Sequence, residues 1–455
     1  MALASASFPA RRILLAGGLT ICLAILSVWI ARVPVHLPLL GTAASILFMA
    51  ALLNADAGLV ILVLSMLFSP QLAVGHGGGT SLETSRAVTL RTDDLVLLLI
   101  GVAWIARMAM HKDLGAVRRT RLNGAIAAYA AICLLSTLIG IEAARVRPLV
   151  GLCFVAKYIE YFIIFFITVN YVRSEEQHRR LLAAVLVTAS LIVLYAYWQM
   201  PSGVRPSAPF EGKDGEPNTL GGYLVLMFSV SAAIALTVPE RRWRRPCALL
   251  AAATIPPLLA TLSRSSWLAF GSALATLLIL SPARRRLAAL AIVGATLLLF
   301  LHPKSVEERI AYTFEGDDRE SLTLGHVRLD SSSSARLTSW GSALEGFVQH
   351  PVTGWGITGY GFLDAQYFRV LVELGIPGLA AFGVLLWAVA RLCGRSFAVL
   401  EQPLHRALGL GMTAGLAGLL VHAIGTNTFI LIRIMEPFWL LCGLCIAALE
   451  LEGKA

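Results

Sequence analysis

Charged residues are scarce in this chain. Of its 455 residues, 57% are hydrophobic and only 14% are charged, a balance that excludes an ordinary soluble domain. Apolar runs of about 17–25 residues recur along the whole length, and a helix of that size crosses roughly 30 Å of hydrocarbon. A β-barrel would instead show alternating segments of about ten residues, which the chain lacks. The composition therefore predicts an all-α polytopic membrane protein.

Metal-ligating and phosphate-binding patterns are also lacking. The seven cysteines lie in or beside apolar segments, and Cys442 and Cys445, although spaced as CxxC, have no second pair or nearby histidine. His350 and His422 stand alone, without a further ligand at metal-binding spacing. No glycine-rich loop of the P-loop or dinucleotide type is present. We therefore expect no metal, no cofactor and no use of ATP.

Basic residues outnumber acidic ones, and the formal net charge is +10. No helix-turn-helix, zinc-finger or RNA-binding pattern accompanies this charge, so we expect no nucleic acid partner. The basic residues gather between apolar segments, as topology signals do in short cytoplasmic loops. The clusters are Lys112, Arg118, Arg119 and Arg121; Arg173, Arg179 and Arg180; Arg241, Arg242, Arg244 and Arg245; Arg284, Arg285 and Arg286; and Arg391, Arg395 and Arg406.

Hydropathy predicts about 14 transmembrane helices in a single membrane domain, residues 1–455. The predicted spans are roughly 13–31, 36–54, 57–74, 93–110, 123–141, 148–171, 181–199, 219–238, 247–262, 266–280, 287–301, 370–390, 406–424 and 428–449. If the N-terminus is cytoplasmic, every basic cluster falls on the cytoplasmic side of the membrane, and the C-terminus is cytoplasmic as well. The first apolar run is long for a signal peptide, so we expect it to be a retained span.

The largest predicted external loop covers residues 302–366. Its Ser331–Ser334 run offers a helix N-cap, and Pro351 after His350 is expected to end the helix that follows. The apolar positions of this amphipathic helix are Leu337, Trp340, Leu344 and Phe347. A turn with four glycines then leads back toward the membrane. We interpret the segment as the roof of an active site.

Two arginines on the external side are candidates for an anion site. Arg264, within Ser263-Arg264-Ser265, interrupts an apolar stretch at the tip of a predicted helical hairpin. A charge at that depth is costly and is often functional, although an arginine that only reaches to the interface is the alternative. Arg336 lies in the first turn of the loop helix, where a solvated surface arginine is the alternative. Guanidinium groups match phosphate oxygens, so the two could form a pyrophosphate clamp.

Further polar residues flank these arginines in the predicted topology. Asp364 precedes a predicted span, and it is either a general base with a pKa raised by burial or a helix N-cap. Asn218, after Pro217, is either an N-cap or a donor that lines the external cavity. Lys157 either pairs with Glu160 or lines a polar cavity. The expected substrate contacts are Asn218, Lys157, Trp340, His350 and Tyr367.

Four motifs in order resemble the O-antigen ligase / O-antigen polymerase superfamily, over roughly residues 90–450. They are Pro217-Asn218-Thr219-Leu220-Gly221; Ser263-Arg264-Ser265; Arg336-Leu337-x-x-Trp340 with His350-Pro351-x-x-Gly354-x-Gly356; and Asp364-x-x-Tyr367 with Leu371-Val372-Glu373-Leu374-Gly375-Ile376-Pro377-Gly378-Leu379. Each motif is weak alone, but their order and their common side of the membrane make the set more specific.

This resemblance implies a helical membrane bundle with one large periplasmic loop over a cavity. It implies an inverting, metal-independent transfer of a glycan from undecaprenyl pyrophosphate to an acceptor sugar, with Arg264 and Arg336 on the leaving group. The implied location is the bacterial inner membrane. The implied partners are the lipid-linked glycan, an acceptor glycan or glycolipid, the lipid bilayer, a chain-length regulator and a flippase.

The resemblance leaves more than one reaction open. Lipid A-core ligases carry a His-Asn pair where this chain has Asp364-Ala365. This departure favours a polymerase of exopolysaccharide or O-antigen-type repeat units, with a ligase as the alternative. A transporter or flippase of lipid-linked glycans is a third hypothesis. It is disfavoured because no internal repeat is visible and the notable charges lie at the external surface.

Overall fold

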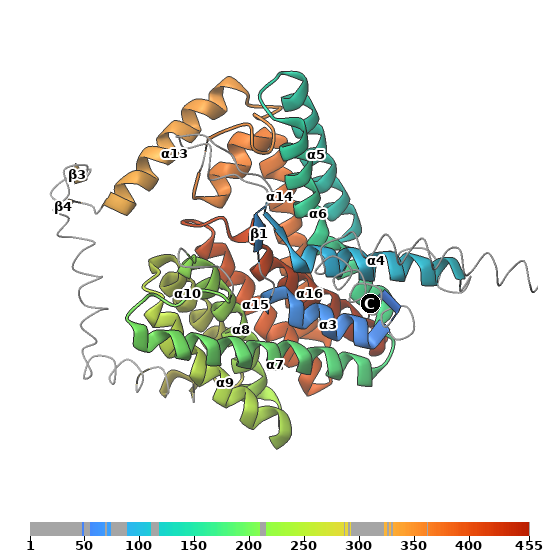
Figure 1. Ribbon diagram of the computed structural model, residues 1–455. Coiled ribbons are helices and arrows are strands. Elements are labelled where there is room, and N and C mark those ends of the chain that lie inside the picture. Colours follow the sequence, from blue (N-terminus) through green and yellow to red (C-terminus); the bar gives the residue numbers. More distant parts are fainter. Residues whose placement is uncertain are drawn as a thin grey trace, which may run out of the picture.

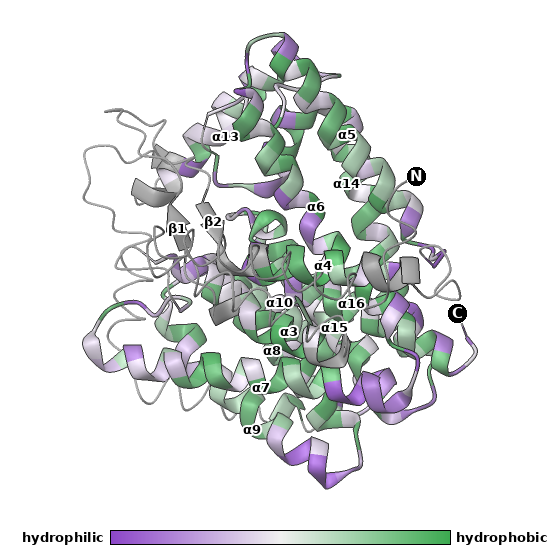
Figure 2. Ribbon diagram, turned by 45° about the vertical axis from the view of Figure 1, so that its right-hand side comes forward, coloured by the Kyte–Doolittle hydropathy of each residue, from purple (hydrophilic) through white to green (hydrophobic). Residues whose placement is uncertain are grey.

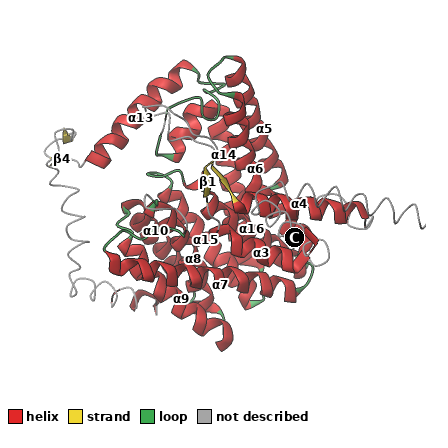
Figure 3. Ribbon diagram, in the orientation of Figure 1, coloured by secondary structure: helices red, strands yellow, loops and turns green. Residues whose placement is uncertain are grey.

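Helices make up most of the described chain (Figure 1, Figure 3). The computed structural model describes residues 48–49, 55–68, 71–73, 89–110, 118–209, 215–285, 287–289, 292, 323–324, 327–328, 331–361 and 363–454. The elements are α3 Ala55–Phe68, β1 Gln71–Ala73, β2 Thr89–Arg91, α4 Thr92–Met110, α5 Asn123–Glu142, α6 Pro148–Tyr171, α7 Glu175–Gln199, η2 Met200–Ser202, α8 Pro217–Thr237, α9 Arg241–Ala260, α10 Arg264–Leu280, β3 Thr323–Leu324, β4 Val327–Arg328, α13 Ser331–Gln349, α14 Gln366–Val399, α15 Pro403–His422, η3 Thr428–Ile430 and α16 Ile432–Leu451. Strands β1 and β2 pair antiparallel, as do β3 and β4.

Seven helices in the described part of the chain are long and apolar enough to cross a membrane, namely α5, α6, α7 extended by η2, α8, α14, α15 and α16. Helix α10 is apolar but shorter. These helices confirm the prediction of a multi-pass, all-α membrane protein. The number of 14 spans stays a prediction, because 13–31 and most of 36–54 and 287–301 lie outside the described residues.

Helices α8, α15 and α16 form the centre of the bundle and are the most completely buried (Figure 1). Close packing depends on glycines along α15. A Cβ at Gly411 would lie 2.6 Å from the Cα of Val230 on α8, and one at Gly418 would lie 2.9 Å from the carbonyl oxygen of Ala269 on α10. Small residues at such crossings let membrane helices approach without hydrophobic driving force.

Helix α14 is bent where its sequence reads Gly375-Ile376-Pro377. Gly375 has φ 69° and ψ −169°, which glycine adopts without steric penalty. The break frees the carbonyls of Val372 and Glu373, and they accept hydrogen bonds from the backbone N–H groups of Trp355 (3.0 Å) and Gly356 (2.9 Å). These hydrogen bonds fix the glycine turn after α13 to the break in α14. The glycines of this turn therefore have a structural role.

The predicted loop helix is present as α13, with two differences. The helix begins at Ser331, so the serine run forms its first turn instead of preceding it. Leu344, expected on the apolar face, is 46% exposed, while Ala343 is buried and Trp340 stacks on Phe368 of α14 with ring centroids 5.0 Å apart. The side that α13 buries is therefore turned by about one residue from the predicted stripe, because α14 sets the contact.

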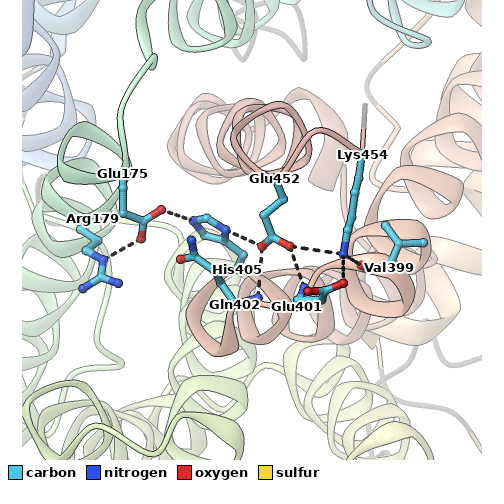
Figure 4. Close-up of polar contacts among 8 residues, drawn as sticks. All are labelled: Glu175, Arg179, Val399, Glu401, Gln402, His405, Glu452 and Lys454. Atoms are coloured by element: carbon cyan, nitrogen blue, oxygen red, sulfur yellow. Dashed lines mark hydrogen bonds and ion pairs between the residues drawn. The ribbon is translucent and has the colours of Figure 1, made fainter.

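The helix ends near the C-terminus are joined by a polar cluster (Figure 4). The buried His405 of α15 lies between two carboxylates, with Nε2 3.0 Å from Glu175 of α7 and Nδ1 2.9 Å from Glu452 after α16. Glu452 also accepts the backbone N–H groups of Glu401 (2.7 Å) and Gln402 (3.2 Å). The ends of α7, α15 and α16 are thus held together at this end of the bundle.

Candidate functional site

The tip between α9 and α10 presents Arg264 as the first residue of α10. Ser263 is the N-cap, and its hydroxyl accepts the backbone N–H of Ser266 at 3.3 Å. Arg205, from the loop before α8, braces the tip through an Nε hydrogen bond of 2.7 Å to the carbonyl of Thr261. The serines of the Ser263-Arg264-Ser265 motif therefore begin the helix, and Arg264 stands at the hairpin tip as predicted.

A buried histidine lies beneath this tip. The Ser266 hydroxyl donates to Ser263 (2.7 Å) and lies 3.1 Å from Nε2 of His422 at the end of α15. Because that hydroxyl is already used as a donor, Nε2 is the donor to Ser266 and Nδ1 is the acceptor from Thr428 at 2.8 Å. In the described part of the chain, the side-chain hydrogen-bond partners of the His422 ring are hydroxyls. Sequence reasoning set it aside as a lone histidine, because its partners are distant in the chain.

Arg336 of α13 meets the same region. A Cβ at Gly425, in the loop after α15, would lie 2.6 Å from Oγ of Ser265 and 3.9 Å from Nε of Arg336. The loop helix and the α9–α10 tip therefore approach the same glycine, and Arg264 adjoins Ser265 in sequence. Figure 1 shows α13 running above α10 at the left of the bundle. The two arginine-bearing elements that are 72 residues apart in sequence are brought together.

Asp364 lies close enough to Arg336 for the charge of that arginine to affect its pKa. Burial raises the pKa of Asp364 from its ordinary 3.8 to about 6; Arg336 and Arg369 act against that rise, and Glu216 adds to it. The residue does not cap α14: the N-cap is Ala365, and the N–H of Gln366 donates to the carbonyls of Ala423 (3.1 Å) and Thr426 (3.3 Å). Of the two interpretations made from sequence, the cap is wrong. A carboxyl with a pKa near neutrality is suited to accept a proton.

Asn218 also borders this region. It is the second residue of α8, whose N-cap is Glu216, so the predicted N-cap role of Asn218 is wrong. Its backbone lies against His422. Gly221 and Gly222 permit the approach, because a Cβ at Gly221 would lie 2.1 Å from Oγ of Ser266 and one at Gly222 would lie 3.0 Å from the His422 ring.

Two of the remaining predicted contacts hold the walls of the site together. Trp340 fixes α13 on α14 through Phe368. The hydroxyl of Tyr367 donates to the carbonyl of Leu420 at 2.7 Å, which ties α14 to α15 close to Asp364. Both residues sit next to the charged groups, and both have structural partners.

The other two predicted contacts have partners elsewhere. His350 packs edge-to-face against Trp355 at 4.8 Å, and burial and Arg145 lower its pKa. Lys157 forms an ion pair of 2.9 Å with Asp94 of α4. The partner of Lys157 is thus a residue 63 positions away, not Glu160 as one reading of the spacing suggested.

Two further charged groups were not singled out from the sequence. Arg369, one turn into α14, pairs with Glu373 at 3.3 Å, and both side chains are buried. Arg433 at the start of α16 is 2% exposed and donates from Nη1 to the carbonyl of Pro209 in the loop before α8. The available signal was an arginine inside an otherwise apolar run, which is expensive unless it has a role.

Residues 247–383 match the family model described as O-antigen ligase. This segment is similar to the O-antigen ligase family, and it is called the O-antigen ligase segment below. It contains the α9–α10 tip, α13, Asp364 and the bent first part of α14, whereas Asn218, Lys157 and His422 lie outside it. The O-antigen ligase segment therefore carries the arginines and the carboxyl that meet at one end of the bundle. A search of curated proteins finds no match.

Proposed function

We propose that this protein is an inverting, metal-independent glycosyltransferase that uses a glycan carried on undecaprenyl pyrophosphate. The observation that carries the proposal is the approach of Arg336 and the Arg264 tip to Gly425, with Asp364 in the field of Arg336, inside the O-antigen ligase segment. Charge that develops on a departing pyrophosphate needs fixed donors, and guanidinium groups offer them in a matching geometry.

The proposed reaction is a single displacement at the anomeric carbon. The acceptor hydroxyl oxygen attacks that carbon, its proton passes to the Asp364 carboxylate, and the bond to the pyrophosphate oxygen breaks. The lipid pyrophosphate leaves with the bonding electrons, and Arg264 and Arg336 stabilise its charge. The donor brings its own activation, so the reaction needs no nucleotide. Asn218 and Trp340 would line the path of the sugars.

The proposed product is a longer lipid-linked glycan, made by polymerisation of repeat units of the exopolysaccharide or O-antigen type. The Asp364-Ala365 pair, in place of the ligases' His-Asn, supports this choice. Attachment of a finished polymer to lipid A-core or another acceptor is the second candidate, and the description of the matching family favours it. In either case we place the site on the periplasmic face of the inner membrane and both termini in the cytoplasm.

The test uses the purified full chain in nanodiscs with undecaprenyl-pyrophosphate-linked repeat units, and it resolves the products by size. A ladder of longer lipid-linked glycans, absent with Arg264→Ala, supports the polymerase. Transfer only after an acceptor such as lipid A-core is added supports the ligase. If neither condition gives transfer by a folded sample, the enzyme proposal is wrong and transport of lipid-linked glycan becomes the better hypothesis.

A further inference from the structure

A cavity of about 660 Å³ opens between the start of α5, the second half of α14 and the end of α16. Four arginines line it: Arg119, Arg121, Arg391 and Arg395. It lies at the end of the bundle that the basic clusters predict to be cytoplasmic, far along α14 from Asp364. Its lining residues Ile446, Leu449 and Glu450 lie near the end of α16, and Figure 2 shows hydrophilic residues around the C-terminus.

The charge of the cavity is strongly positive. Among its described lining residues the one carboxylate, Glu450, is paired with Arg118, which does not line the cavity. Arg395 donates one N–H to the backbone carbonyl of Lys454 at 2.7 Å and keeps its other donors for the cavity. Arg119, Arg121 and Arg391 are exposed. A ligand that satisfies this arrangement is an anion with several acceptor oxygens, and a phosphate group has that geometry.

The remaining wall of the cavity is apolar. Trp387 lines it with 59% of its surface exposed, and the guanidinium of Arg391 lies 4.6 Å from the centre of its ring. One helical turn away on α14, Val384 is 54% exposed. The basic cavity therefore adjoins exposed apolar side chains of α14, of the kind that face lipid. Tryptophan beside arginine is typical of the membrane–water interface.

Topology signals alone require only that basic residues lie on one side of the membrane. They do not require arginines from the α5 start and from α14 to converge on one cavity beside an exposed tryptophan. The α9 arginines Arg244 and Arg245 are exposed, belong to the same predicted side and do not line this cavity. They provide an internal comparison for the effect of position.

We propose that this cavity binds an anionic glycerophospholipid of the cytoplasmic leaflet. The phosphodiester lies among Arg119, Arg121 and Arg391, and an acyl chain runs along Trp387 and the apolar face of α14. Basic pockets between helices on the cytoplasmic side are suited to anionic headgroups. The site is separate from the proposed glycan site and does not depend on the proposed reaction.

The test is native mass spectrometry of the detergent-purified full chain, titrated with dioleoylphosphatidylglycerol or with dioleoylphosphatidylcholine. We expect at least about tenfold tighter binding of phosphatidylglycerol, and a loss of that preference in Arg121→Gln/Arg391→Gln. The matched variant Arg244→Gln/Arg245→Gln removes the same charge from α9 and should keep it. Both altered residues of the test variant are exposed; should the double variant aggregate, Arg391→Gln alone serves.

A third arm adds inorganic phosphate as competitor. If phosphatidylglycerol binding survives millimolar phosphate, the acyl chain contributes and the lipid assignment holds. If phosphate displaces it fully, the cavity is a free-phosphate site and the proposal is wrong. Equal binding of the two lipids would also overturn the proposal. So would an equal loss of preference in both double variants, because the effect would then depend on net charge and not on the position of the arginines in the cavity.

Discussion

The two ends of the helical bundle each hold a buried histidine, but in opposite electrostatic settings. His405 lies between the carboxylates of Glu175 and Glu452, and Lys454 pairs with the neighbouring Glu401 at 2.8 Å (Figure 4). His422 has hydroxyl partners, while the charges near it belong to arginines on separate elements. Closely matched charges hold helix ends together. At the other end arginines lie around a carboxyl of raised pKa, which is the arrangement that the proposed reaction requires.

The largest effect is expected from the arginines of the site. Arg264→Ala and Arg336→Ala should each reduce glycan transfer by at least about 10³-fold, since removal of one donor to a developing anion costs 10²–10³ in rate and a charged, bidentate donor costs more. The measurement is the amount of product formed per folded protein molecule. An immunoblot follows the amount of each variant in the membrane. Arg336→Lys should recover only part of the rate.

Arg241→Ala, at the exposed start of α9 and the opposite end of the bundle, is the matched control and should retain full activity. Wild-type activity in either Arg264→Ala or Arg336→Ala would contradict the hypothesis that the two arginines bind the pyrophosphate.

Asp364→Asn should slow transfer by about 10²–10⁴-fold, the contribution typical of a general base. In the wild type, kcat/KM should rise with pH and level off above about 6, because only the ionised carboxylate accepts the proton. A pH–rate profile of wild type and variant gives the measurement. A flat profile between pH 5 and 8 would remove Asp364 from the reaction.

The same variant should be more stable than wild type above pH 6. The folded pKa of Asp364 is raised, so the neutral acid is favoured by folding and stability is lost as pH rises through about 6. A shift of this size corresponds to at most about 3 kcal/mol. Thermal unfolding in detergent should show a larger difference in stability between variant and wild type at pH 8 than at pH 5, because the loss begins near the ordinary pKa of 3.8 and is complete above about 6. A variant less stable than wild type at pH 8 would contradict the burial argument.

At the other end, Glu452→Gln should cost about 1–3 kcal/mol of stability and leave transfer per folded molecule unchanged. Burial alone would raise the pKa of Glu452, but the N–H groups of Glu401 and Gln402 and the His405 ring outweigh it, and the pKa is lowered. The stabilisation is therefore present at neutral pH and lost as pH falls through the folded pKa. Glu401→Gln, at an exposed carboxylate, is the control with a smaller change in melting temperature.

The smallest effect is expected at Lys157. Its ion pair with Asp94 makes it a part of the α4–α6 contact, so Lys157→Gln should change transfer less than tenfold. A double-mutant cycle with Asp94→Asn measures the pair: the double variant should be more stable than the sum of the two single losses. A loss of activity as large as that of Arg336→Ala would restore Lys157 as a substrate contact.

Sequence reasoning found the helices because each apolar run is a local signal. The predicted 148–171 and 123–141 match α6 and α5 to within one residue. Helix α7 begins six residues before the predicted 181, because Ser174 and Gln177 form a capping box ahead of a polar first turn that hydropathy does not register.

The site was only partly predictable, because its geometry depends on contacts between distant residues. Arg264 and Arg336 could be named from their positions in loops, but their approach depends on Gly425, which no local pattern indicates. His422 could not be recognised without Ser266, which lies 156 residues earlier. Leu344 was misplaced because the contact of α13 is decided by Phe368 and Ala343, not by the helix itself.

The bend at Gly375 has a mechanical consequence for Arg336. The turn after α13 is bonded to the broken ladder of α14, and Ile376 also donates to the carbonyl of Pro351 at 2.8 Å, so the C-terminal end of α13 is anchored to the bend. At about 1.5 Å per residue, Arg336 stands roughly 20 Å from that anchor. A difference of about ten degrees in the direction of α13 would therefore displace the guanidinium by about 3.5 Å. The bend in α14 thus sets the direction of α13 and, through the length of that helix, the position of Arg336.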